Sequence, residues 1–214
     1  AMIDSPATVF LVDDDPAVLK GLERLLRAAG YRTESFPSAA AFLERWRQGP
    51  APGCLLLDVA MPELDGLQLQ QALGPGAAAP PIVFLTGHGD IPMSVKAIKA
   101  GAVDFLTKPV RDENLLPAIA QALERDRRQR AERAEREVMA GRWASLTPRE
   151  REVLALVARG LLNKQIAFEL GASEKTIKIH RGRGMHKMRV ASVADLVRLL
   201  QKLGRPPDRR SAPR

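Results

Sequence analysis

The sequence predicts an α/β fold with a doubly wound, five-stranded parallel sheet, joined by a long helical linker to a small all-α domain. Strand-like and helix-like patterns alternate five times in the first half of the chain, and such alternation is typical of a parallel sheet with helices on both faces. Charge also divides the chain, because residues 1–118 carry a net charge of −4 and residues 119–214 a net charge of +12. The basic half indicates a polyanionic partner, either nucleic acid or a membrane surface.

Composition limits the possible classes of protein. Cys54 is the single cysteine among 214 residues, which excludes an intramolecular disulfide and a cysteine-based zinc site. No run approaches the roughly 20 apolar residues that a membrane-spanning helix needs, and the first residues do not form a basic-then-apolar signal peptide. We therefore expect a cytoplasmic protein in a reducing compartment.

The five predicted strands lie at residues 8–12, 31–35, 54–57, 81–86 and 103–107, and most of them are short apolar runs. The run that ends at Asp58 is apolar without a break, as expected for a strand that is buried on both faces of a parallel sheet. Helical spacing predicts helices between the strands, at residues 16–30, 38–48, 67–73 and 91–100. The Gly- and Pro-rich residues 74–80 are predicted to form a loop.

Polar side chains stand where four of the predicted strands end. Asp13 and Asp14 follow the first strand, Asp58 the third, Thr86 the fourth and Lys108 the fifth. The carboxyl ends of parallel strands meet at one edge of the sheet, so we expect these groups to converge. A carboxylate cluster suits Mg²⁺, and a nucleophilic carboxylate beside that cation and a lysine can accept a phosphoryl group. The alternative for each residue alone is an ordinary cap, turn or surface residue.

Residues 112–140 have a helical pattern whose apolar side fades along the sequence. Four apolar residues at its start are expected to pack on the first domain: Leu115, Leu116, Ile119 and Leu123. Beyond them, residues 124–137 are almost entirely charged residues and alanine, which predicts a solvated helical linker. A coiled coil is less favoured because no apolar heptad repeat is sustained, and a disordered tether is the remaining alternative.

Residues 145–204 contain four short predicted helices. The second is expected to begin at Asn163 and to end at Gly171, and the third to begin behind Ser173, which leaves a three-residue turn. Two short helices joined in this way, the second of them basic, indicate a helix-turn-helix motif that binds DNA. A basic solvated surface is the alternative, and a membrane surface is less favoured because the helices are well capped and divided between core and surface. The Pro- and Arg-rich residues 205–214 are predicted to be disordered.

Three motifs in the first half resemble the receiver domain of bacterial two-component response regulators, in particular the FixJ-like ones. They are VDDD at 12–15, LLLDVAMPELDG at 55–66 and FLTGHGDIPMSVKAIKAGAVDFLTKP at 84–109. The resemblance implies a CheY-like fold with Asp58 as the phosphoacceptor. It also implies that Thr86 and Phe105 form a switch pair, that Lys108 contacts the phosphoryl group and that the Lys108–Pro109 bond is cis. The Mg²⁺ ligands that it implies are Asp13, Asp14, Asp58 and the backbone carbonyl of Ala60.

The stretch LTPREREVLALVARGLLNKQIAFELGASEKTIKIHRGRGMHKM closely resembles the LuxR-type DNA-binding domain. The resemblance implies that Lys178, Ile179 and Gly182 face the bases, and that residues 192–203 form a helix used for dimerisation on DNA. The residues that it places at the DNA backbone are Lys175, Thr176 and Arg183. The expected domains are a receiver at 4–122, a linker at 123–143, a DNA-binding domain at 144–204 and a tail at 205–214.

The two resemblances together predict a transcriptional response regulator that is not an enzyme. A cognate sensor histidine kinase would phosphorylate Asp58, and the phosphorylated homodimer would bind double-stranded promoter DNA, with RNA polymerase as a further partner and no membrane partner. One alternative is a phosphatase or phosphotransferase that forms an aspartyl-phosphate during turnover. Dehalogenase-like enzymes of that kind resemble this chain less, because they have a second Asp two residues after the nucleophile, where Ala60 stands. The other alternative is a constitutive DNA-binding regulator whose receiver does not switch.

Overall fold

The computed structural model describes residues 7–74, 79–87 and 91–204. The chain divides into two compact units, residues 1–131 and residues 132–214. The predicted disordered tail and most of the predicted loop at 74–80 lie outside the described residues. Within the described ranges, every helix is too short or too polar to cross a lipid bilayer.

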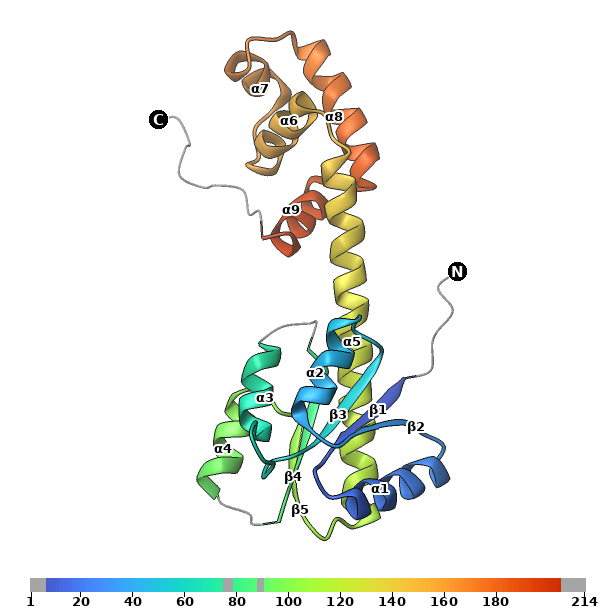
Figure 1. The fold of residues 1–214 in the computed structure, drawn as a ribbon. Coiled ribbons are helices and arrows are strands. Elements are labelled where there is room, and N and C mark those ends of the chain that lie inside the picture. Colours follow the sequence, from blue (N-terminus) through green and yellow to red (C-terminus); the bar gives the residue numbers. More distant parts are fainter. Residues whose placement is uncertain (1–6, 75–78, 88–90, 205–214) are drawn as a thin grey trace. The chain divides into compact units, whose positions relative to one another are not determined.

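The first unit is built on a five-stranded sheet in which all neighbouring strands are parallel, in the order β2-β1-β3-β4-β5 (Figure 1). The strands are β1 (Thr8–Val12), β2 (Arg32–Phe36), β3 (Gly53–Asp58), β4 (Ile82–Thr86) and β5 (Asp104–Thr107). Every residue of β3 and β4 is buried, which explains their unbroken apolar sequences. The predicted doubly wound parallel sheet is therefore confirmed.

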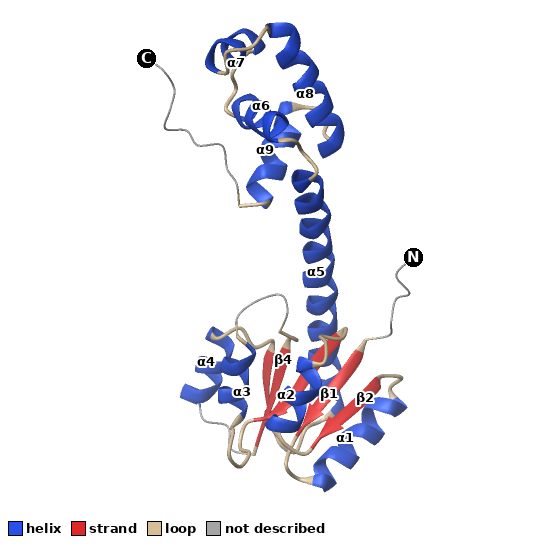
Figure 2. Cartoon of the chain, turned by 45° about the horizontal axis from the view of Figure 1, so that its top comes forward, coloured by secondary structure: helices blue, strands red, loops and turns tan. Residues whose placement is uncertain are grey.

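Helices cover both faces of the sheet (Figure 2). They are α1 (Pro16–Ala28), α2 (Ala39–Arg47), α3 (Gly66–Leu73), α4 (Ile91–Lys99) and α5 (Asp112–Ala144). One apolar cluster joins alternate β-strand residues to Leu26 of α1 and to Leu115 and Ile119 of α5. The other cluster joins the opposite faces of the strands to α2, α3 and α4 through Phe42, Leu69 and Ala97. The alternation of side chains along each strand thus assigns the helices to the two faces.

Predicted boundaries in the first unit shift by one or two residues in the structure, as the second strand and the first helix illustrate. The second strand begins at Arg32 and extends to Phe36, because Phe36 pairs in register with Val12 and packs its ring 5.5 Å from that of Phe42. The first helix ends at Ala28, since Gly30 has a φ of +88°, a left-handed conformation that terminates the helix. The predicted helix start is confirmed, because the Asp15 side chain accepts a hydrogen bond from the Ala17 N–H at 2.8 Å.

The helix α5 is continuous from Asp112 to Ala144, and its two ends belong to different units. Leu115, Leu116, Ile119 and Leu123 pack on the first unit, as predicted. Contacts with the first unit continue beyond residue 122, since the buried Asp126 accepts a hydrogen bond from the Gly53 N–H at 3.0 Å. Met139 and Trp143, near the other end of α5, pack on the core of the second unit. The predicted linker is thus partly docked at both of its ends.

The second unit contains α6 (Pro148–Ala158), α7 (Asn163–Glu169), α8 (Glu174–Met188) and α9 (Val193–Lys202). Thr147 and Glu150 form the predicted capping box at the start of α6, and Ser173 caps α8. The predicted start of α7 at Asn163 is confirmed, and Leu162 occupies the cap position before it. The Asn163 side chain accepts a hydrogen bond from Arg181 on α8 at 2.9 Å.

Two glycines in α8 have different surroundings. A Cβ atom at Gly184 would lie 2.9 Å from Leu154 Cδ1 and 3.0 Å from its Cγ, and Leu154 is a fully buried core residue of α6. A Cβ atom at Gly182 would have no neighbour within 4 Å. Gly184 is therefore required for the close approach of α6 and α8, whereas Gly182 only lowers the helix propensity of α8.

We expect Gly184→Ala to destabilise the second unit by about 1–3 kcal/mol, because the added methyl group overpacks the contact with Leu154. Gly182→Ala is the matched control and should stabilise the same unit by about 0.5–1 kcal/mol through helix propensity. Urea unfolding followed by the fluorescence of Trp143, in a Trp46→Phe background, measures both changes. Equal effects of the two substitutions would contradict the packing explanation.

Candidate functional site

The structure brings the predicted strand-end residues together at the carboxyl edge of the sheet. Oxygen atoms of Asp13, Asp14 and Asp58 all lie within 4.8 Å of one another. Lys108 approaches the same cluster from the end of β5, with its Nζ 2.7 Å from Asp13 Oδ2 and 3.1 Å from Asp58 Oδ2. Three strands therefore supply a charged site whose members are up to 95 residues apart in the chain.

The two inner carboxylates of the site are buried and the outer one is exposed. Asp13 and Asp58 have exposed fractions of 1% and 5%, whereas Asp14 is open to solvent. Burial raises the pKa of Asp58 above its usual value, although the hydrogen bond and positive charge of Lys108 act in the opposite direction. Asp58 Oδ1 is buried and has no hydrogen-bond partner among the described residues. The site thus holds an acceptor oxygen that the chain itself does not satisfy.

These residues fit a hard divalent cation. Mg²⁺ prefers carboxylate and water oxygens, and the cluster offers three carboxylates, one of which faces solvent. A bound cation would also offset the repulsion between the clustered negative charges. The backbone carbonyl of Ala60 stays a predicted ligand. The Ala60 backbone also forms a hydrogen bond that favours the charged form of Asp58 and so acts to lower the pKa of that carboxyl.

Thr86 and Phe105 lie on neighbouring strands beside this cluster. Thr86 is buried at the end of β4, and its carbonyl accepts a hydrogen bond from the Lys108 N–H at 2.7 Å. Phe105 is half-buried on β5 and pairs in register with Phe84, their ring centroids 6.0 Å apart. The Lys108–Pro109 peptide bond is cis, as the resemblance implied.

Sequence reasoning missed one residue that shapes the acidic site. A Cβ atom at Gly66 would lie 2.4 Å from the backbone oxygen of Asp58, so only glycine fits where α3 begins beneath the loop that follows β3. Asp65 next to it caps α3 by accepting a hydrogen bond from the Gln68 N–H at 2.7 Å. The Asp65–Gly66 pair predicted a turn correctly, but the close approach to Asp58 could not be seen without the fold.

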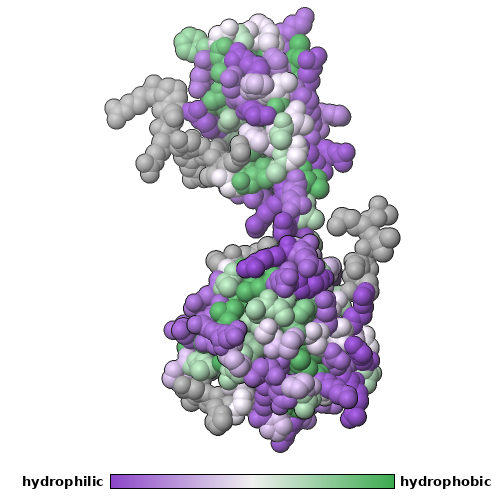
Figure 3. Space-filling view, in the orientation of Figure 1, coloured by the Kyte–Doolittle hydropathy of each residue, from purple (hydrophilic) through white to green (hydrophobic). Residues whose placement is uncertain are grey.

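The second candidate site is the outer face of α8. Ile177, Gly184 and Met188 are buried against the core, whereas all six predicted DNA contacts are exposed: Lys175, Thr176, Lys178, Ile179, Gly182 and Arg183. Ile179 is an apolar residue with an exposed fraction of 45% on this otherwise polar surface. Hydrophilic side chains cover the surface where Figure 1 places α8 (Figure 3). A basic helix face with one apolar side chain suits both phosphates and base edges.

Polar contacts that the sequence did not reveal hold α8 in the second unit. Glu150 on α6 is buried, and its Oε2 lies 2.7 Å from Lys187 Nζ, which keeps the pKa of Glu150 below its usual value. Arg149 donates a hydrogen bond to the Leu170 carbonyl at the end of α7 at 2.6 Å. Together with the Asn163–Arg181 hydrogen bond, these contacts connect α6, α7 and α8 and hold the basic face of α8 in a fixed orientation within the second unit.

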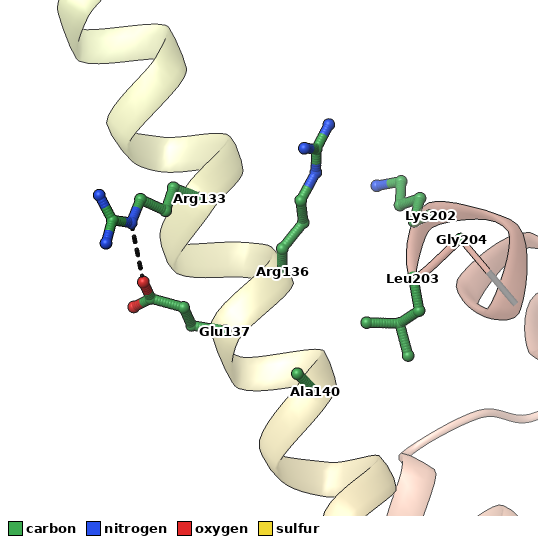
Figure 4. Close-up of a pocket in the computed structure, with 7 residues that line it drawn as sticks. All are labelled: Arg133, Arg136, Glu137, Ala140, Lys202, Leu203 and Gly204. Carbon is green, nitrogen blue, oxygen red and sulfur yellow. Dashed lines mark hydrogen bonds and ion pairs between the residues drawn. The ribbon is translucent and has the colours of Figure 1, made fainter. Parts of the chain in front are cut away.

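The helix α9, expected to mediate dimerisation, packs its apolar residues within its own unit. Leu196, Leu199 and Leu200 are buried in the core. A groove of about 470 Å³ separates the end of α9 from α5 and is lined by Arg133, Arg136, Glu137, Ala140, Lys202, Leu203 and Gly204 (Figure 4). Two of its three basic side chains are paired, Arg133 with Glu137 at 2.9 Å and Lys202 with Glu135 at 2.8 Å. Dimerisation through α9 stays a prediction.

The parallel sheet with its acidic edge defines a receiver domain, and the second unit defines a helix-turn-helix output domain. A family model for the response regulator receiver domain matches residues 9–120, and one for bacterial regulatory proteins of the luxR family matches residues 144–200. The chain therefore belongs to the response regulators with a LuxR-type DNA-binding domain, and it is FixJ-like.

Sequence similarity to known response regulators extends over nearly the whole chain. The response regulator protein TmoT of Ectopseudomonas mendocina is 49% identical over 202 residues, covering 94% of this chain and 91% of that protein. The transcriptional regulatory protein FixJ of Bradyrhizobium diazoefficiens is 40% identical over 196 residues, covering 92% and 95%. The solved structure of the response regulator StyR has a TM-score of 0.80 at 48% identity, covering 92% of this chain and 100% of that one. Both predicted resemblances are thereby confirmed.

We expect Asp58→Asn to stabilise the metal-free protein by about 1 kcal/mol at pH 7, because it removes a buried charge. The pKa of Asp58 is raised in the folded state, so ionisation costs stability above that raised pKa and costs nothing below the usual value for Asp. The advantage of the variant should therefore disappear as the pH falls to about 4.

Urea unfolding in EDTA at several pH values measures this difference. Glu63→Gln is the matched control, since Glu63 is an exposed residue of the same loop. A variant less stable than the wild type at pH 7 would show that Asp58 is a net stabilising residue, contrary to this argument.

Proposed function

We propose that phosphorylation of Asp58 by a sensor histidine kinase controls dimerisation and the binding of promoter DNA, and thereby regulates transcription. The observation that carries this proposal is the buried Asp58 Oδ1, which has no hydrogen-bond partner among the described residues and lies beside Lys108 and two further carboxylates. An oxygen in this position is available as a nucleophile, and the surrounding charges match those that phosphoryl transfer requires.

The chain's own residues have separate roles in the proposed transfer. A carboxylate oxygen of Asp58 bonds to phosphorus as the bond from phosphorus to the kinase histidine nitrogen breaks, and that nitrogen retains the bonding electron pair. Lys108, 3.1 Å from Asp58 in the free protein, contacts an oxygen of the arriving phosphoryl group. Mg²⁺ held by Asp13, Asp14 and Asp58 supplies further positive charge at the phosphoryl oxygens when it is bound.

The proposed switch follows from the added charge. A phosphoryl group adds about −1.5 to −2 charges and three acceptor oxygens, which the hydroxyl of Thr86 can reach from the end of β4. Movement of Thr86 toward the group leaves space for Phe105, which is only half-buried and already contacts the β4 ring of Phe84. The surface formed by α4, β5 and α5 changes as a result, and this change favours the homodimer.

The proposed output is sequence-specific binding by α8. Lys178, Ile179 and Gly182 face the bases, while Lys175 and Arg183 contact phosphates. Thr176 is the sixth proposed contact, at the backbone; its hydroxyl lies 2.8 Å from Ser173 Oγ in the helix cap. A homodimer would bind two half-sites about one helical turn or a multiple of it apart, and RNA polymerase would be the partner at the promoter.

Two features favour this regulator over an enzyme that turns over an aspartyl-phosphate. Ala60 provides no carboxylate two residues after Asp58, so the site has no positioned acid for the leaving group of a phosphomonoester. The relatives TmoT and FixJ, which this chain matches over more than 90% of their length, are named as regulators. Steady release of phosphate from a phosphomonoester by the purified protein would favour the enzyme instead.

We expect Asp58→Asn to abolish the increase in DNA affinity that acetyl phosphate and Mg²⁺ produce in the wild type, because the amide cannot accept the phosphoryl group. DNA fragments selected from a random pool by the phosphorylated wild type provide the probe, and fluorescence anisotropy provides the affinity. A variant that still responded to acetyl phosphate would refute Asp58 as the control point. A wild type that bound DNA equally well without phosphorylation would favour the constitutive regulator.

We expect Lys178→Ala to lower affinity for the selected fragment by about 1–3 kcal/mol, with a smaller loss on unrelated DNA, since a base contact carries sequence information. Lys175→Ala should weaken binding to both fragments. It should also reduce the slope of log K against log salt concentration by about 1, because one phosphate contact is lost. Binding titrations at several salt concentrations separate the two effects. Lys20→Ala, the same charge change on the exposed face of α1, is the control and should change neither.

A further inference from the structure

The helix α5 is held to the first unit by a charged contact that the proposed phosphoryl transfer does not use. Asp126 has an exposed fraction of 5%, and its Oδ2 accepts hydrogen bonds from the Gly53 N–H at 3.0 Å and from Arg130 Nε at 2.8 Å. The Arg130 guanidinium also donates to the Ala51 carbonyl. A buried charge pair is costly and contributes little net stability, so its value lies in fixing geometry. Here it fixes α5 to the amino end of β3.

A second contact joins α5 to the turn that follows α4. Arg125 Nη1 donates a hydrogen bond to the Gly101 carbonyl at 3.1 Å, and Arg125 Nη2 lies 3.9 Å from where a Cβ atom of Gly101 would stand. Gly101 has a φ of +98° and terminates α4 with a left-handed residue. Unlike the Asp126 contact, this one is a single hydrogen bond at an exposed position. It can break at little cost.

The helix α4 connects the two ends of the sheet. It follows β4, whose last residue Thr86 lies beside Asp58, and it leads back to the amino end of β5 near Gly101. Among the residues of α4 whose side chains are described, only Ala97 is buried, and Val95 and Ile98 are each 46% exposed. Gln70 of α3 reaches the carbonyls of Ala97 and Ala100 with long bonds of 3.4 Å. Among its described residues, α4 therefore buries little apolar surface, which favours a shift of the helix as a unit.

We infer that Arg125 is a positioning residue that transmits a shift of α4 to α5, with the Asp126–Arg130 pair as the fixed point about which α5 responds. The inference rests on the proposed function, because the shift originates at Asp58 and Thr86. A movable bond to Gly101 and a fixed bond to Gly53 stand on adjacent residues of one helix. A change at the first therefore alters how α5 leaves the first unit, and α5 continues directly toward the DNA-binding domain.

The test compares Arg125→Met with Arg128→Met in the full chain. Both substitutions remove one positive charge from an exposed position on α5, but the partner of Arg128 among the described residues is Glu124 on the same helix, at 2.7 Å. Phosphorylation by acetyl phosphate is measured by intact mass, and DNA affinity by anisotropy before and after phosphorylation. The melting temperature of each variant should match that of the wild type.

We expect Arg125→Met to become phosphorylated at the wild-type rate while the phosphorylation-dependent gain in DNA affinity falls by about three- to tenfold, the range expected for the net contribution of one ordinary hydrogen bond. Arg128→Met should keep the full gain, and Arg125→Lys, which retains a donor, should recover part of it. An unchanged gain in Arg125→Met, or an equal loss in Arg128→Met, would overturn the inference. If the wild type itself showed no gain, the proposed function would fail first.

Discussion

A buried carboxylate with too few partners is the constraint on which the first unit depends. Asp58 lies at the end of a fully buried strand, and its charge is tolerated only because Lys108 reaches it from β5 while also contacting Asp13 on β1. Three strands must therefore end level with one another, which the parallel register from β1 through β5 ensures. The close approach of Gly66 to the Asp58 backbone belongs to the same arrangement, since α3 begins directly beneath the site.

Two buried carboxylates in opposite states lie at the two ends of β3, Asp58 as its last residue and Asp126 on α5 in contact with its first residue. At the amino end, Asp126 accepts bonds from Gly53 and Arg130, so its oxygens are satisfied and it is chemically inert. At the carboxyl end, one oxygen of Asp58 has no partner among the described residues, and its pKa is raised by burial. Burial alone thus does not mark a reactive group; the difference lies in how many donors the fold supplies. The strand β3 therefore connects Asp58, which is proposed to be phosphorylated, to Gly53, which is bonded to the fixed Asp126.

The predictability of each site residue from sequence depends on the physics that places it. Asp13, Asp58, Thr86 and Lys108 could be found because a short apolar run has a visible end, and parallel strands bring such ends together. Asp126 could not, because it stands in a run of charged residues where nothing local shows which charge is buried, and its partner Gly53 is 73 residues away. The Glu150–Lys187 pair, 37 residues apart, was missed for the same reason. The start of α7 at Asn163 was predicted correctly, but the hydrogen bond of its side chain to Arg181 could not be, because it depends on the packing of α7 against α8.

The net charge of the basic half is larger than the number of cationic side chains that can contact DNA. Three of the cationic side chains form hydrogen bonds or ion pairs within the second unit: Arg149 with the Leu170 carbonyl, Arg181 with the Asn163 side chain and Lys187 with the buried Glu150. These contacts hold α8 in place and do not serve to bind a ligand. Lys175, Lys178 and Arg183 remain exposed on the outer face of α8. Salt weakens DNA binding according to the number of phosphates neutralised, so the slope reflects this smaller exposed set together with any exposed cation beyond α8. Total charge indicates the class of partner, while the folded structure determines which cations can meet it.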